Sequence, residues 1–131
     1  MNNSTQGWLP YAKARDFTIE PGGLLVRFAD GRSHRLRVIE QDNTWLLRGL
    51  VVRHARLEFD QSPALAAALK NRHYFLCGLR VDEKDRLIAE CHVPKPGLSA
   101  AEFQLQARHL AGECDRLEYL ITGRDREARM S

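Results

Sequence analysis

The chain has 131 residues, a formal net charge of +3 and the apolar content of an ordinary globular protein, which fits one domain with its own hydrophobic core. No run of about 18 apolar residues is present, which excludes a transmembrane helix. The polar start of the chain, broken by Pro10, lacks the order of a secretory signal peptide, so we expect a cytoplasmic protein with no membrane partner.

The N-terminal part of the chain predicts a weakly held segment followed by a hairpin. Residues 1–23 are polar and end in the turn sequence Pro21-Gly22-Gly23, so we expect them to be loosely attached. In "GLLVRFADGRSHRLRVIEQ", apolar residues alternate before and after Asp30-Gly31, which is a strong signal for a β-hairpin. The return strand should direct Leu36 and Val38 into the core and its arginines to the other face.

The middle of the chain predicts a strand and then a helix. "TWLLRGLVVRHARLEF", residues 44–59, is expected to form a third strand, with a bulge or bend at Gly49. "SPALAAALKNRH", residues 62–73, has Ser62 as N-cap, Pro63 at the first helical position and Asn71 as a C-terminal stop. It is therefore predicted to be a helix.

The last third of the chain predicts a second hairpin and a long helix. "YFLCGLRVDEKDRLIAECHV", residues 74–93, alternates like two strands, with its "DEKD" tip polar and exposed. Ser99 and Glu102 have the spacing of a capping box, and Gly123 is suited to end the helix. Its apolar face consists of residues at intervals of three or four: Phe103, Ala107, Leu110, Cys114, Leu117 and Ile121.

These elements define a fold class and a domain organisation. The order strands, helix, strands, helix predicts an α+β domain, with an antiparallel sheet of two hairpin-containing segments and helices packed on one face. We expect a loosely attached segment over residues 1–23, a single α+β domain over residues 24–123 and a charged tail over residues 124–131.

The second half of the chain resembles the YbjN family, which shares its fold with type III secretion chaperones. Three stretches carry this resemblance: "LKNRHYFLCGLRVDEKDRLIAECHVP", the helix start "LSAAEF" and the helix end "ECDRLEYLITGRD". The resemblance implies a non-enzymatic protein that binds another protein, often as a homodimer, without a cofactor. The chain departs from the chaperones at its start, where only "YAKARDF" could form a turn or two of their first helix.

Candidate catalytic and metal-binding residues lack a supporting pattern. The spacing of Cys77, Cys91 and Cys114 matches no zinc motif, so we expect three buried free thiols. His92 follows Cys91 directly, and in a strand the two side chains point to opposite faces. The sequence has no nucleophile elbow and no glycine-rich phosphate loop. We therefore predict no enzyme, no catalytic residue, no metal and no cofactor.

Arginine-rich strands form one candidate binding surface. Seven arginines but only three acidic residues lie between residues 24 and 56. They could be a solvated sheet face, a surface for an anionic protein, or a surface that grips single-stranded nucleic acid with an interleaved aromatic ring. The candidate residues of this anionic-partner surface are Arg27, Arg35, Arg37, Arg48 and Trp45.

The last helix offers a second candidate surface. Leu105, Tyr119 and Leu120 lie off its main apolar stripe, and an exposed apolar edge of this kind suits self-association or the binding of another protein. Its acidic residues Glu113 and Asp115 are expected on the outer surface, paired with nearby arginines. We predict a chaperone-like or regulatory protein-binding module that forms a homodimer, with a nucleic-acid-binding module as the alternative.

Overall fold

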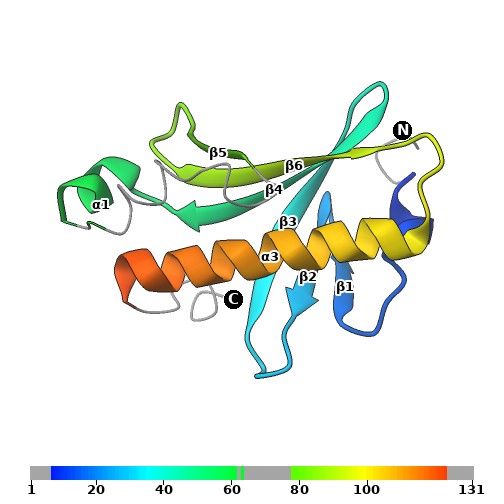
Figure 1. The fold of residues 1–131 in the computed structure, drawn as a ribbon, viewed down its shortest axis with the longest axis horizontal. Coiled ribbons are helices and arrows are strands. Elements are labelled where there is room, and N and C mark those ends of the chain that lie inside the picture. Colours follow the sequence, from blue (N-terminus) through cyan, green and yellow to red (C-terminus); the bar gives the residue numbers. More distant parts are fainter. Residues whose placement is uncertain (1–6, 62, 64–77, 124–131) are drawn as a thin grey trace.

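The structure, a computed structural model, describes residues 7–61, 63 and 78–123. Six strands form one antiparallel sheet in the order β1-β2-β3-β4-β6-β5, and the helix α3 runs across one of its faces (Figure 1). This arrangement confirms the predicted α+β class. The elements are the 3-10 helix η2 (Leu9–Ala12), β1 (Phe17–Glu20), β2 (Gly23–Arg27), β3 (Ser33–Glu40), β4 (Thr44–Val52), α1 (Ala55–Gln61), β5 (Gly78–Val81), β6 (Leu87–Pro94) and α3 (Ala100–Thr122).

The first predicted hairpin is confirmed as β2 and β3. Gly31 adopts a φ of 91°, a conformation that glycine reaches without strain, and the Phe28 N–H donates to the Arg32 carbonyl oxygen at 2.7 Å. Leu24 lies opposite Leu36 in the register of the two strands, and both side chains are buried against α3. Alternation along the strands thus puts the core on one face and leaves arginines on the other.

The close packing of α3 on the sheet depends on a glycine in β4. The register of β4 against β6 shifts between Leu50 and Val52, so the irregularity falls just after Gly49. Gly49 itself serves the approach of the helix, because a Cβ at this position would lie 2.5 Å from the Cys114 Sγ and 3.1 Å from a methyl carbon of Leu36. The absence of a side chain there lets α3 lie directly on the sheet.

The long helix begins and ends as the sequence predicts. The Ser99 hydroxyl accepts a hydrogen bond from the Glu102 N–H at 3.1 Å, and the Glu102 carboxylate reaches back to the N-cap backbone to complete the capping box. Gly123 is left-handed with a φ of 75°, and its N–H donates to the Tyr119 carbonyl oxygen at 2.7 Å. All six residues of the predicted apolar stripe are buried.

The segment before β2 is more firmly attached than predicted. Trp8 is 2% exposed and stacks on Phe103 of α3 at a centroid distance of 6.4 Å, while Tyr11 stacks on the same ring at 5.9 Å. Phe17 begins β1, which pairs with β2. The prediction of a loose segment over residues 1–23 is therefore wrong for residues 8–23, because three aromatic rings and one strand bind this segment to the domain.

The structure also differs from the prediction in the middle of the chain. The third strand ends at Val52, and "ARLEFDQ" forms the helix α1 in place of the predicted strand continuation. Asp85 holds the start of α1, because its carbonyl oxygen accepts from the Ala55 N–H at 2.7 Å and its carboxylate from the Arg56 N–H at 3.1 Å. The predicted helix 62–73, except Pro63, and the tail 124–131 lie outside the described residues, as do Phe75 and Cys77 of the second hairpin.

None of the helices in the described part of the chain is long and apolar enough to cross a lipid bilayer.

Candidate functional site

Four arginines share the sheet face that points away from α3. Arg35 and Arg37 alternate with buried residues of β3, and Arg37 lies directly opposite Arg48 of β4. Arg80 lies opposite Ile88, which is two residues from Glu90 in β6, so Arg80 is on the same face. We call this set, Arg35, Arg37, Arg48 and Arg80, the outer arginine face.

Carboxylates are built into the outer arginine face. Glu90 of β6 accepts from the Arg48 Nε at 2.6 Å and from the Arg80 Nε at 2.8 Å, and Glu20 accepts from the Arg35 Nε at 3.1 Å. Burial raises the pKa of Glu90, but hydrogen bonds from Arg80 and Arg48 and the positive charges of both guanidinium groups lower it by more. The net effect is a lowered pKa, so Glu90 stays ionised between its partners. No local sequence pattern indicates that Glu90 belongs to this face, because it lies 42 positions from Arg48 in the chain.

Two predicted members of the anionic-partner surface lie elsewhere. Trp45 is 5% exposed, because its register opposite Val93 turns it toward the core, and the Lys95 Nζ lies 4.5 Å from the ring centroid. The inclusion of Trp45 in an exposed surface is therefore wrong. Arg27 is exposed, but its guanidinium donates to the Thr18 hydroxyl and, at 2.5 Å, to the Arg15 carbonyl oxygen. It belongs to the β1–β2 end of the sheet.

The predicted apolar edge of α3 is exposed and falls into two parts. The exposed fractions of Leu105, Tyr119 and Leu120 are 64%, 53% and 53%. Because a helix rises about 1.5 Å per residue, Leu105 lies roughly 21 Å from the other two along the axis. Tyr119 and Leu120 border a hollow of about 300 Å³ that also involves Gly112 and Arg116, whereas Leu105 borders a separate hollow of about 280 Å³ beside Pro96.

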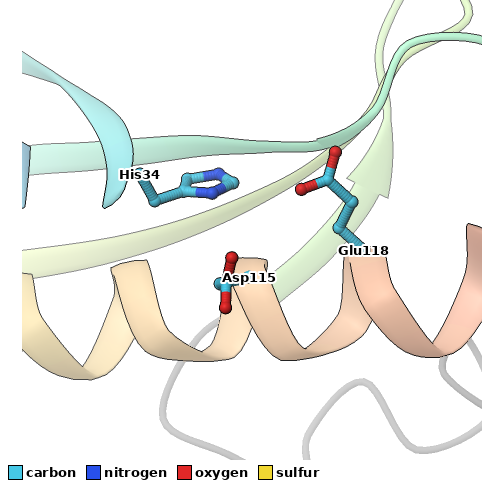
Figure 2. Close-up of side chains that lie close together, drawn as sticks. All are labelled: His34, Asp115 and Glu118. Atoms are coloured by element: carbon cyan, nitrogen blue, oxygen red, sulfur yellow. The ribbon is translucent and has the colours of Figure 1, made fainter. Parts of the chain in front are cut away.

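A cluster of buried polar side chains lies between β3 and the C-terminal half of α3. Figure 2 shows His34 pointing from the sheet toward Asp115 and Glu118, which lie one turn apart on the helix. The three residues are 0%, 4% and 4% exposed. The His34 Nε2 lies 2.7 Å from the Leu50 carbonyl oxygen, and the Arg32 guanidinium donates to the Asp115 carboxylate.

This cluster contains side chains that can bind a divalent metal ion, with one possible ligand atom from each residue within 4.8 Å of the others. Two observations favour a hydrogen-bonded ionic cluster. Arg32 already pairs with Asp115, and the imidazole is held through Nε2 by a backbone carbonyl. The cluster therefore joins strand to helix, and the expectation of no metal site stays a prediction.

The outer surface of α3 differs in part from the prediction. Glu113 pairs with Arg116 at 2.6 Å, as expected, and Arg108 pairs instead with Asp16 at 2.7 Å. Asp115 is buried, so its predicted place on the outer surface is wrong. A sequence signal did exist: Asp115 is three residues before Glu118, and both lie next to the apolar stripe at Cys114 and Leu117.

Asp82 organises the turn between β5 and β6, so this tip is not fully exposed as predicted. Its carboxylate is 3% exposed and accepts from the Arg86 Nε at 2.8 Å. It also accepts from the backbone N–H groups of Lys84 at 3.0 Å and Arg86 at 2.9 Å. Burial raises the pKa of Asp82, but these hydrogen bonds outweigh it and lower the pKa to about 2. The folded protein thus favours the ionised carboxylate.

This lowered pKa predicts a pH-dependent contribution to stability. Because the folded pKa lies below the unfolded one, the stabilisation is complete above about pH 4 and is lost as the pH falls toward 2. We expect Asp82→Asn to lower the free energy of unfolding by about 1–2 kcal/mol at pH 7. Urea unfolding of both proteins at pH 7 and at pH 2.5 checks this: the difference should shrink at the lower pH. A constant difference would contradict the assignment.

The fold and the sites together define an antiparallel α+β protein with one face packed by a helix, an arginine-bearing outer face and an exposed apolar helix end. No protein-family model matches the chain, and no curated protein matches it. Solved structures do match. A chain of the ExsC–ExsE complex aligns with a TM-score of 0.54 at 14% identity, over 91% of this chain and 93% of that one.

Two further matches are similar in extent. A chain of the heterodimeric ExoU–SpcU complex from the type III secretion system of Pseudomonas aeruginosa aligns with a TM-score of 0.56 at 14% identity, over 95% of this chain and 100% of that one. A chain of the HopA1–SchA chaperone–effector complex aligns with a TM-score of 0.51 at 17% identity, over 100% and 99%. The protein therefore has the type III secretion chaperone-like fold that the sequence resemblance implies, and membership of the YbjN family stays a prediction.

Proposed function

We propose that this chain is a non-enzymatic, cytoplasmic, chaperone-like protein that binds another protein. The observation that supports it most is the fold. It matches nearly the full length of chains from three protein complexes, one of them described as a chaperone–effector complex. At such low sequence identities the matches indicate a shared fold and do not identify the partner. The choice of binding surface therefore rests on the residues of this chain.

The C-terminal end of α3 is the surface that we propose for self-association. Tyr119 and Leu120 are both about half exposed and flank a hollow opened by Gly112, which has no side chain. Exposed neighbouring apolar side chains of this size are typical of an interface, since their burial releases ordered water. The neighbouring arginines Arg32 and Arg116 would form a polar rim that orients the second copy.

The nucleic-acid alternative has less support. Its sequence argument paired arginines with an aromatic ring that could stack on bases. Trp45 is buried beneath the sheet, and carboxylates such as Glu90 lie between the arginines of the outer face. A phosphate backbone crossing this face would meet those negative charges. We therefore keep protein binding as the proposed function.

The first test of this proposal is the mass of the purified protein in solution. We expect the wild type to be a dimer and the double variant Tyr119→Glu/Leu120→Glu to be a folded monomer, because burying two carboxylates in an apolar contact is unfavourable. Light scattering measures the mass, and circular dichroism checks the fold. Leu105→Glu, at the other end of the same helix, is the matched control and should remain dimeric. An unchanged mass in the double variant would overturn the assignment of this surface.

A second test concerns the partner. Affinity capture from lysate of the source cells, with and without nuclease, should recover a discrete protein that resists nuclease treatment. Partners that disappear with nuclease would favour the nucleic-acid alternative.

A further inference from the structure

A small hollow on the outer face of the sheet is lined mainly by guanidinium groups. It has a volume of about 180 Å³ and lies where β3, β4 and the start of β6 meet. Two apolar side chains, the half-buried Leu50 and the buried Ile88, face each other across β4 and β6 and form part of its wall. Five arginines line the rest: Arg35, Arg37, Arg48, Arg53 and Arg86. We call this site the arginine hollow.

The positive charge in the arginine hollow exceeds the negative charge beside it. Three of its arginines have a carboxylate partner: Arg35 with Glu20 at 3.1 Å, Arg48 with Glu90 at 2.6 Å and Arg86 with Asp82 at 2.7 Å. Glu90 also pairs with Arg80, a sixth guanidinium. Six arginines therefore share three carboxylates, which leaves three positive charges in excess among the described residues.

Arg37 and Arg53 provide the excess positive charge that a ligand can reach. Both side chains are exposed, and among the described residues no carboxylate lies within ion-pair distance of either one. Arg37 is the direct cross-strand neighbour of Arg48, and like charges in that position destabilise a sheet. A bound anion would relieve this repulsion, and the apolar wall would strengthen the attraction by excluding water.

We infer that the arginine hollow binds an acidic segment of a partner protein, with its Asp or Glu side chains paired to Arg37 and Arg53. This inference rests on the proposed function, since it names the chemistry of the partner. A guanidinium binds a carboxylate through two parallel hydrogen bonds, which gives such a contact direction as well as strength. An aliphatic side chain of the same segment would pack on Leu50 and Ile88.

The chemistry of the hollow favours an acidic peptide over a nucleic acid. None of the described side chains that line it is aromatic, so bases would have no ring on which to stack. The fixed carboxylates of Glu20, Asp82 and Glu90 interrupt the positive charge at intervals. A peptide that alternates acidic and apolar residues can avoid them, whereas an evenly charged phosphate backbone cannot.

The experiment measures binding of a fluorescein-labelled peptide of alternating glutamate and leucine by fluorescence anisotropy at low salt. We expect Arg37→Glu/Arg53→Glu to weaken binding by about tenfold or more. Arg37→Lys/Arg53→Lys should weaken it by about threefold, because lysine keeps the positive charge but cannot form the two parallel hydrogen bonds of a guanidinium group. Lys13→Glu/Lys84→Glu makes the same change in net charge at two exposed sites outside the hollow and should change the affinity less than twofold.

Several results would overturn the inference. No binding of the peptide to the wild type, or equal losses in the glutamate variant and the lysine-site control, would show that the hollow is not a specific site. Tighter binding of a single-stranded oligonucleotide that depends on Arg37 and Arg53 would reassign it to nucleic acid. Dimerisation and capture of a protein partner are measured on the same variants. If both persist unchanged while the peptide fails to bind, the inference fails and the proposed function stands.

Discussion

Replacing Phe103 with alanine is expected to lower the free energy of unfolding by about 3–5 kcal/mol, the usual cost of removing a fully buried aromatic ring. Phe103 is 0% exposed and lies under both Trp8 and Tyr11, so the change removes ring contacts as well as volume. A loss of this size is a large fraction of the stability of a small domain. Urea unfolding followed by tryptophan emission measures it.

The same variant tests whether the N-terminal segment depends on this ring. Without Phe103, Trp8 and Tyr11 lose the ring on which they stack, so trypsin should cleave after Lys13 or Arg15 faster than in the wild type. Leu105→Ala is the matched control, because it lies two residues away on the same helix and is 64% exposed. It should change the free energy of unfolding by less than about 0.5 kcal/mol. Similar effects of the two substitutions would contradict the proposed attachment.

The sequence predicts those parts of the fold that local chemistry determines. Asp30-Gly31 marks the first hairpin, because the loop between Phe28 and Arg32 needs a left-handed residue that glycine supplies at position 31 without strain. Ser99, Glu102 and Gly123 mark the ends of α3 through hydrogen bonds to residues three or four positions away. The alternation of Arg35 and Arg37 with buried neighbours correctly assigns the outer face of β3. Each of these patterns is short, and each depends little on the rest of the chain.

The features that the sequence does not predict depend on partners far away in the chain. Trp8 is buried because its ring stacks on Phe103, and Asp115 is buried where Arg32 pairs with it across 83 positions. The arginines near Trp45 in the sequence suggest an exposed ring, but the register of β4 against β6 sets its face and turns it toward the core. The arginine hollow likewise needs Arg86, which β6 brings beside β4.

The buried cluster beneath α3 provides the last test, because two acidic residues of one helix differ mainly in their burial. Asp115 is 5% exposed in its side chain and pairs with Arg32, whereas Glu113 is 20% exposed and pairs with Arg116. We expect Asp115→Ala to lower the free energy of unfolding by about 2–3 kcal/mol, since the change removes the buried carboxylate that accepts from Arg32.

Two considerations keep this expected loss below the full cost of an isolated buried charge. The Arg32 side chain is 39% exposed, and Asp30 lies 3.2 Å from its Nε, so the guanidinium keeps water and one carboxylate as partners. Glu113→Ala, the control, should cost at most about 1 kcal/mol, because its pair is more exposed to water and salt. Urea unfolding compares the two variants. Equal losses would mean that Arg32 and Asp115 contribute no more than a surface ion pair, and that apolar packing alone holds α3 against β3.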